Sequence, residues 1–346
     1  MSAAAESEAA PLSARAVGGR PPVRPRVRRG RKRSHARAAV IAALALVALY
    51  LLLPRVAGLE YTWQRIRDGS PRWLAAAVAF EASSFVGYVW LLRRIGRPLT
   101  WRAAWQITLA GVAATRVVTV AGARGIAVTI DGLRRSGLST REAAERQAVD
   151  LAVLYGVFFS LTFLDGLVLL LSGHTLALSA APAALAVIVI ALGLAMARVP
   201  ATFERALQRR LGRPGRWLGA FPSVVAAGVR GAGELMRSRD PALLGALAWW
   251  AFDVAAMWAC VHAFGGSVGA LELLMAYLAG HAFNILPVPG GVGPVEGGLI
   301  AALVAFGEPA GLALVAVLAY QLVSVWLPAG PGAVALARSS RASARR

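Results

Sequence analysis

The stretch Pro287-Val-Pro-Gly-Gly-Val-Gly-Pro294 interrupts a hydrophobic segment that runs from residue 270 to residue 306. A second long hydrophobic segment, 104–130, is broken in a similar way by Val120-Ala-Gly-Ala-Arg-Gly125. Proline removes a helical hydrogen bond and glycine lowers helix propensity, so neither segment is expected to form one continuous helix. Irregular backbone at membrane depth survives only where protein buries it or where it lines a wet cavity. The two breaks are therefore the first candidates for a functional site.

The composition around these breaks is that of a membrane protein. The chain has 346 residues, of which 58% are hydrophobic and 16% are charged, and its mean hydropathy is +0.61. In a soluble domain about a quarter of the residues are charged. A membrane-spanning helix needs about 20 mostly apolar residues. The other segments of this kind are 38–56, 71–92, 148–171, 175–197, 240–264 and 310–336. We therefore predict an all-α integral membrane protein.

The arginines predict which loops are cytoplasmic, because positive loops stay on that side. Loops 93–102 and 131–147 both carry arginines, so we expect both to be cytoplasmic. Segment 104–130, which lies between them, must then enter the membrane and return as a re-entrant hairpin. The basic residues of 337–346 reach the same side only if segment 270–306 is also re-entrant, from the outside.

This pattern predicts about six membrane-crossing helices and two re-entrant helical hairpins. The order helix, helix, hairpin, helix occurs once in 38–171 and again in 175–336, with three crossings in each half, so we predict an inverted-topology repeat. Leu109-Ala-Gly-Val-Ala113 also aligns with Leu278-Ala-Gly-His-Ala282. Interrupted segments at matching places in two halves point to a transport site. Only the mixed charge of 57–70 does not fit the scheme.

The charged tails and the longest loop are expected to be cytoplasmic. Residues 1–37 are basic and poor in large apolar groups, which predicts a disordered tail, and 38–56 is interpreted as a retained first helix. Loop 198–239 is rich in arginine and is expected to attract anionic lipid headgroups, as is the tail. Loop 198–239 forms either a helix lying in the membrane interface or a solvated linker. The apolar residues that suit such a helix are Phe203, Leu207, Leu211, Trp217, Leu218 and Phe221.

Several polar residues lie beside the second break. Tyr277, His281 and Asn284 recur at helical spacing and share one face, where they either bond to neighbouring helices or line a site. Glu296 follows the break, close to the start of the next helix. It either interacts with the helix dipole or faces a polar cavity as a headgroup or proton partner.

Two arginines lie in the first broken segment. Arg116 should face protein or water, because a guanidinium at mid-membrane costs about 2.5–3.5 kcal/mol on insertion scales. Arg124, at the break, could extend to the interface instead. Each forms either a structural ion pair or part of an anion site, and Glu81 and Asp253 are the expected deep partners. The residues expected closer to the interfaces are Asp150, Asp165 and Glu272.

Several classes of site are excluded by what the sequence lacks. No cluster of Cys and His suggests a metal site, and the single cysteine, Cys260, cannot form an internal disulfide. No phosphate-binding loop for ATP occurs, and the glycines of 290–298 follow no strand, so no nucleotide cofactor is expected. The basic residues lie between apolar segments, so no nucleic acid is expected either. Ser139-Thr-Arg-Glu142 is typical of a capping box at the start of a helix.

Three stretches together resemble a known family. They are Asn284-Ile-Leu-Pro-Val-Pro-Gly-Gly-Val-Gly-Pro-Val-Glu-Gly-Gly-Leu299, the last-helix run Tyr320-Gln-Leu-Val-Ser-Val-Trp-Leu-Pro328, and the first-half loop from Gly125 to Ala148. They resemble the lysylphosphatidylglycerol synthase transmembrane-region family, over roughly 38–336. This family includes the flippase half of the bacterial multiple peptide resistance factor.

The resemblance implies a flippase-like protein of the bacterial plasma membrane that translocates or binds polar lipids, either anionic or aminoacylated. Gln321 stands where the family often has arginine, and Thr119-Val120 stands where its first break usually has proline. The aminoacyl-transferase domain of the full synthase has no counterpart here, so we do not expect an enzyme. The candidate headgroup-binding residues are Arg116, Arg124, Tyr277, His281, Asn284, Pro287, Pro289, Gly290, Gly291, Gly293, Glu296, Tyr320 and Gln321.

Two other functions remain open from the sequence. One is a membrane scaffold or partner of a cell-envelope enzyme that transports nothing. The other is a membrane-embedded transferase that uses Glu296 and His281. A deep cavity that both hairpins reach would favour transport, whereas a fully packed core would favour the scaffold. Membrane phospholipids are the expected partners, and a homo-oligomer is compatible with the sequence.

Overall fold

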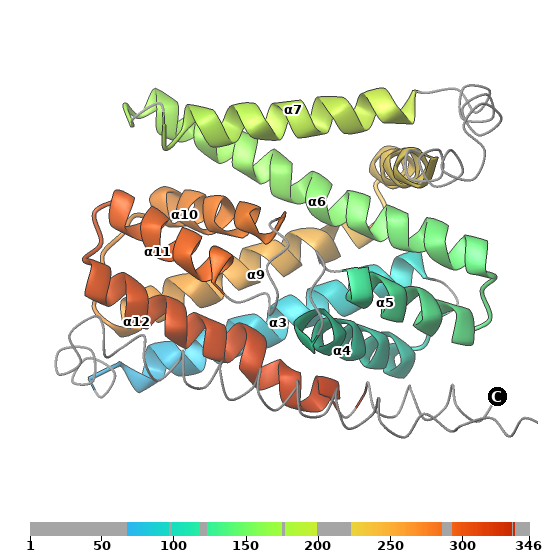
Figure 1. Ribbon diagram of the computed structural model, residues 1–346, viewed down its shortest axis with the longest axis horizontal. Coiled ribbons are helices and arrows are strands. Elements are labelled where there is room, and N and C mark those ends of the chain that lie inside the picture. Colours follow the sequence, from blue (N-terminus) through green and yellow to red (C-terminus); the bar gives the residue numbers. More distant parts are fainter. Residues whose placement is uncertain are drawn as a thin grey trace, which may run out of the picture. The chain divides into compact units, whose positions relative to one another are not determined.

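The computed structural model describes residues 68–96, 99–117, 123–174, 177–198, 223–285, 293–333 and 335. All of them belong to one compact unit, Leu52–Arg346. Throughout these described ranges the regular structure is helical and no strand occurs (Figure 1).

Five of the described helices are long and apolar enough to cross a membrane. They are α3 (Pro71–Ile95), α6 (Thr140–Leu171), α7 (Ala180–Ala197), α9 (Ala242–Ala263) and the helix Ala310–Ala333, which begins as α12 (Ala310–Gln321). The prediction of an all-α membrane protein is confirmed. The sixth predicted crossing, 38–56, lies outside the described residues, as do the tails 1–37 and 337–346.

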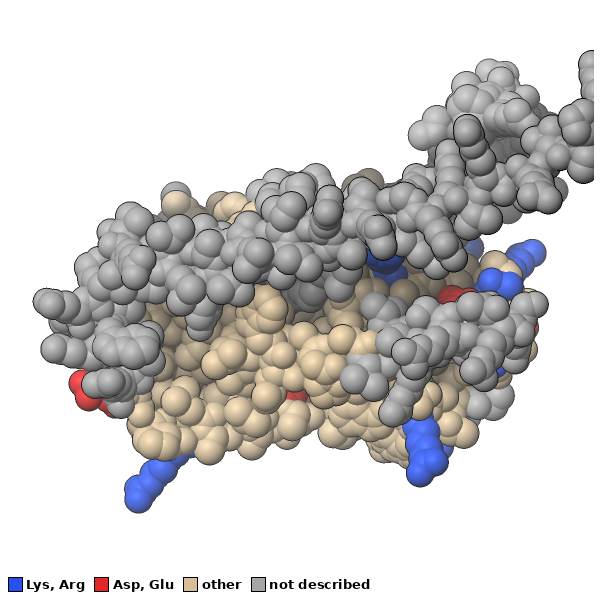
Figure 2. All heavy atoms as spheres, turned by 60° about the horizontal axis from the view of Figure 1, so that its bottom comes forward, with Lys and Arg blue, Asp and Glu red and all other residues tan. Residues whose placement is uncertain are grey.

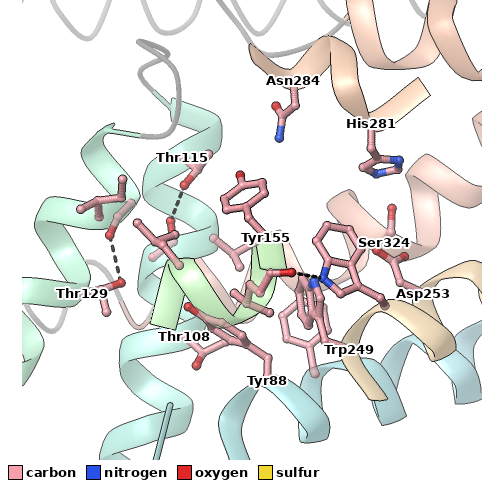
Figure 3. A pocket seen from close by; sticks show the side chains of 18 of the residues that line it. Tyr88, Thr108, Thr115, Thr129, Tyr155, Trp249, Asp253, His281, Asn284 and Ser324 are labelled. Carbon is pink, nitrogen blue, oxygen red and sulfur yellow. Dashed lines mark hydrogen bonds between the residues drawn. The ribbon is translucent and has the colours of Figure 1, made fainter. Parts of the chain in front are cut away.

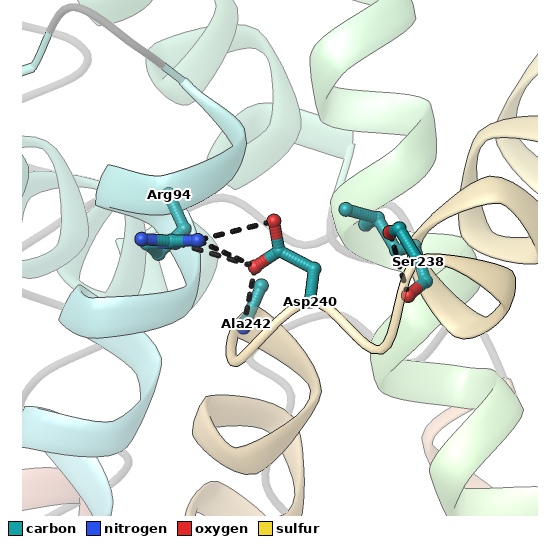
Figure 4. A network of polar contacts seen from close by, with 5 residues as sticks. Arg94, Ser238, Asp240 and Ala242 are labelled. Atoms are coloured by element: carbon teal, nitrogen blue, oxygen red, sulfur yellow. Dashed lines mark hydrogen bonds and ion pairs between the residues drawn. The ribbon is translucent and has the colours of Figure 1, made fainter.

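Helices α3 and α9 form the centre of the unit and run antiparallel (Figure 1). At one end, the backbone N–H of Ser70 donates to the carbonyl of Ala263 at 2.8 Å. At the other end, Arg94 donates to both carboxylate oxygens of Asp240, at 3.0 and 3.1 Å, and the same carboxylate accepts from the N–H of Ala242 (Figure 4). These contacts fix the register of the two helices.

The two broken segments each form a pair of helices. The first pair is α4 (Trp101–Val117) with α5 (Ala123–Arg135). The second is α10 (Ala270–Ala282), which ends in the 3-10 turn Phe283–Ile285, with α11 (Pro294–Ala305). The helices of each pair pack against each other. At 1.5 Å per residue, α10 and α11 are about 20 Å long, which is too short to cross a hydrocarbon layer of about 30 Å.

The first helical pair returns to the end of the bundle at which it begins. Leu99, just before α4, and Leu133, near the end of α5, pack in one cluster with Leu92 of α3 and Ala143 of α6. α3 ends and α6 begins at this end of the bundle, so both ends of the first pair lie there.

The second helical pair also returns to the end at which it begins. Glu308, which follows α11, accepts hydrogen bonds from the N–H groups of Ser267 and Val268, at 2.7 and 2.6 Å. These two residues precede α10, where α9 ends, so the second pair begins at the opposite end of the bundle from the first. This geometry agrees with two hairpins that enter from opposite sides, whereas their depth in a membrane stays a prediction.

The element order is the same in both halves. α3 is followed by the first helical pair and α6, and α9 is followed by the second pair and α12. Because α3 and α9 run antiparallel, the matching helices have the opposite directions that an inverted repeat requires. The exposed face of the bundle is largely uncharged (Figure 2). The exposed large apolar side chains of the bundle include Leu164 and Leu171 of α6 and Ile188 and Leu192 of α7.

The local prediction for the start of α6 is confirmed. The hydroxyl of Ser139 accepts from the N–H of Glu142, and the Glu142 carboxylate accepts from the N–H of Ser139 at 2.9 Å. Within the predicted loop 198–239, residues 223–237 are helical and pack on α6, with Gly228 against Ala148. The six apolar residues that suit an interfacial helix lie outside the described residues.

Candidate functional site

A cavity of about 460 Å³ lies between the two helical pairs. The first pair contributes lining residues near its turn, including Thr115 at the end of α4 and Gly125 at the start of α5. The second pair contributes His281 at the end of α10 and Asn284 in the turn that follows. Figure 3 shows Thr115 and Thr129 on one side of this space and His281 and Asn284 on the other. Described residues on either side of the first break and just before the second therefore line one cavity.

The ends of the helices at the breaks come together through glycine. A Cβ added at Gly125 would lie 2.2 Å from the Thr115 hydroxyl and 3.0 Å from the carbonyl of Gly111. In the second pair, a Cβ at Gly280 would lie 2.7 Å from the Leu299 side chain. Gly111 and Gly280 are the residues that align between the two halves of the sequence, and each permits a close helix–helix contact.

One wall of the cavity carries a buried cluster of two carboxyl groups and two tyrosines. Asp253 of α9 accepts a hydrogen bond from the hydroxyl of Tyr277 at 2.5 Å and another from that of Tyr320 at 2.7 Å. Glu81, on α3, lines the cavity next to Asp253. All four side chains are less than one-tenth exposed. The cluster joins α3 and α9 to the second hairpin and to α12.

A second buried polar cluster lies beside the same cavity. The carboxylate of Asp150, on α6, accepts from the hydroxyl of Tyr88 at 3.1 Å and from the amide of Gln147 at 3.3 Å. Tyr88 and Gln147 line the cavity. The side chain of Asp150 is fully buried, while its depth relative to the membrane interface stays a prediction.

Part of the cavity wall is aromatic. The indole N–H of Trp250 donates to the carbonyl of Leu154 at 2.9 Å, which ties α9 to α6. Trp249 packs against Phe85 and Tyr88 of α3. The helix Ala310–Ala333 contributes Ser324, which lies in a π-helical turn, Leu322–Trp326. Turns of this kind are frequent at functional sites.

The structure brings only part of the predicted site together. His281, Asn284 and Tyr320 line the cavity, and Tyr277 reaches it through Asp253. The ring of His281 stacks on that of Tyr277 with a centroid distance of 4.1 Å. Gln321 is buried beside Tyr320 but does not line the cavity.

The remaining predicted residues lie elsewhere or outside the description. Glu296 accepts from the N–H of Gly293 at 2.6 Å and so caps α11, which agrees with the helix-terminus alternative. Arg124 is exposed in the first turn of α5. Arg116 lies in the last turn of α4, but its side chain is not described. Pro287, Pro289, Gly290 and Gly291 lie outside the described residues.

Sequence reasoning missed the contribution of Tyr88, Gln147 and the cavity threonines. Tyr88 follows Glu81 by seven residues, which places both on one face of α3, and this spacing was a usable signal. The pairing of Glu81 with Asp253, rather than with an arginine, had no such signal. Within the described ranges, no group of three or more His, Cys, Asp or Glu side chains is arranged to hold a metal ion.

Comparison with known proteins agrees with this architecture. The sequence model of one family, described as the lysylphosphatidylglycerol synthase TM region, matches residues 40–332. That match covers both helical pairs and every helix that lines the cavity. A search of curated proteins finds no match to this chain. The chain is therefore a multi-pass membrane protein that belongs to the lysylphosphatidylglycerol synthase transmembrane-region family.

Proposed function

We propose that this chain carries polar lipids between the two leaflets of a membrane. The headgroup passes through the cavity and the acyl chains stay in the surrounding lipid. The observation that carries the proposal is that the two hairpins begin at opposite ends of the bundle, and that described residues near the turn of each hairpin line the same polar cavity. A site between two such hairpins can open toward either side by rocking of one half against the other.

The two rival functions have less support. A scaffold needs no cavity at the meeting point of the hairpins, yet this cavity is lined by tyrosine, threonine, glutamine and acidic side chains. A transferase that used Glu296 with His281 would need both residues at one site. Glu296 instead caps α11 and does not line the cavity.

The charge of the cavity lining indicates which lipid headgroups the cavity can accept. Glu81 and Asp253 line the cavity, and none of the lining residues that the structure describes is a lysine or arginine. This lining favours a headgroup that carries an amine. A purely anionic headgroup would need a cation, because a buried unpaired charge is costly. Arg116, at the end of the cavity-lining helix α4, is the candidate for that cation.

The test uses the purified full chain in vesicles. Fluorescent lipids labelled on an acyl chain are compared, with phosphatidylglycerol, lysylphosphatidylglycerol and phosphatidylethanolamine headgroups, and a quencher that cannot cross the membrane reports the outer leaflet. We expect faster redistribution than in protein-free vesicles for at least one amine-bearing headgroup. Arg116→Ala should slow the redistribution of phosphatidylglycerol more than that of the amine-bearing lipids. A folded chain that moves none of these lipids faster than protein-free vesicles would contradict the proposal.

A further inference from the structure

The Glu81 side chain is a buried acid with an unused hydrogen-bonding atom. Its side chain is 5% exposed, it lines the cavity, and its Oε2 has no hydrogen-bond partner in the described structure. Asp253 beside it is 7% exposed, and its two carboxylate oxygens already accept from Tyr277 and Tyr320. The two acids thus differ in their surroundings, because only Asp253 is held by hydroxyl donors.

The groups around this pair provide no described positive charge to balance two carboxylates. The titratable groups that face it from the packed helices are Cys260 of α9, Tyr277 and His281 of α10, and Tyr320 of α12. The Nδ1 of His281 lies 3.0 Å from the carbonyl of Tyr277, so this ring is oriented by its own helix. Two adjacent carboxylates in a low-dielectric site repel each other strongly unless a cation or a proton lies between them.

We propose that Glu81 and Asp253 form a proton-binding site. Asp253 stays ionised, since the two tyrosine hydroxyls donate to it. Glu81 carries the proton, because its buried carboxyl group has an unpartnered oxygen and lies beside the ionised Asp253. When the proton leaves, it passes to a water molecule in the cavity, which gives a glutamate anion and a hydronium ion. Glu81 is suited to this exchange because it lines the cavity.

Other polar residues of α3 lie between this pair and one end of the bundle. Tyr88 follows Glu81 by two helical turns, lines the same cavity and donates to Asp150. Arg94 follows at the end of the helix, where it pairs with Asp240. The arginine pattern predicts that this end is cytoplasmic. Because the cavity is lined by Tyr88 as well as Glu81, it extends from the pair toward this end, and we expect the proton to exchange on the side of the membrane on which Arg94 lies.

Proton binding itself is tested without any lipid transport. Infrared spectra of the purified full chain in nanodiscs report the C=O stretch of protonated carboxyl groups, which shifts in heavy water. We expect a band that is lost as the pH rises, and that is missing in Glu81→Gln. Asp253→Asn should also remove this band. The variant replaces the Asp253 anion with a neutral amide that can donate to Glu81, so Glu81 no longer needs its proton. The control Glu296→Gln alters the carboxylate that caps α11 and should keep the band.

Three results would overturn the proposal. One is a band of unchanged size in a folded Glu81→Gln variant. Another is loss of the band from Glu296→Gln alone. The third is loss of the wild-type band when sodium is added at constant pH, which would assign the pair to a metal cation. Gel filtration and thermal unfolding of each variant show whether it remains folded, and the nearly isosteric Asp253→Asn provides a second reading if Glu81→Gln does not fold.

Coupling of the proton to lipid movement is a separate step that rests on the proposed function. A pH gradient across the vesicles should change the wild-type rate of lipid redistribution, and this dependence should disappear in Glu81→Gln. If the wild-type rate does not change with the pH gradient while the infrared band is intact, the coupling to lipid movement is rejected but proton binding is not. If no lipid moves while the band behaves as expected, the proposed function fails and the proton-binding site stands.

Discussion

Gly245→Ala should destabilise the bundle by about 2 kcal/mol, near the middle of the range for overpacked cores. The added Cβ would lie 2.7 Å from the carbonyl oxygen of Gly87 and 3.0 Å from the N–H of Leu91. Both atoms belong to the backbone of α3, so no side chain can move aside to relieve the contact. α3 and α9 would have to separate, and these two helices hold Glu81 and Asp253 together.

Gly156→Ala is the matched control for this substitution. Gly156 is also inside a helix, α6, but nothing lies within 4 Å of the Cβ that alanine would add. This variant should be stabilised by about 0.5–1 kcal/mol, because glycine is a poor helix former. Unfolding of both variants in mixed detergent gives the comparison. Equal effects of the same sign would show that α3 and α9 are not in close contact at Gly245.

Val112→Phe should slow lipid redistribution roughly tenfold, which corresponds to about 1.4 kcal/mol of added barrier. Val112 lies on α4 and lines the cavity, so a phenyl ring there occupies space that the headgroup needs. The valine is only partly buried, and the open cavity gives the larger ring room without forcing the helices apart. The fold should therefore persist while transport falls.

The control for this experiment is the same substitution on the outer surface. Val304 lies on α11 with 41% of its side chain exposed and does not line the cavity. Val304→Phe should redistribute lipid at the wild-type rate in the vesicle assay. If Val112→Phe redistributes lipid as fast as Val304→Phe does at equal protein density, the headgroup does not pass through the cavity.

The architecture was accessible from the sequence because its signals are local. α11 begins at Pro294, the last residue of the second predicted break, whereas α5 already begins at Ala123, inside the first one. The capping box at Ser139 predicted the start of α6. Arginine-bearing loops indicated that 104–130 returns to its starting side, and the packing of Leu99 with Leu133 agrees with this.

The candidate site was only partly accessible, because it depends on contacts between distant residues. The spacing of Tyr277 and His281 indicated a shared helix face, but it could not show that Tyr277 donates to Asp253. Glu296 had two interpretations of similar weight, and a helix start can satisfy a carboxylate without any ligand. The partner of Asp150, Tyr88, lies on another helix, and periodicity does not reveal a polar pair of this kind.

Photo-crosslinking of a lipid with a reactive headgroup tests most directly whether the headgroup occupies the cavity. The purified chain in vesicles is irradiated with a photoreactive aminoacylated lipid, and the labelled peptides are mapped by mass spectrometry. We expect labels at Thr108–Thr115 of α4 and at His281–Asn284, competed by the unlabelled lipid and reduced in Val112→Phe. Labels confined to outward-facing helices such as α7, with none at the ends of the two hairpins, would contradict a cavity route for lipid headgroups.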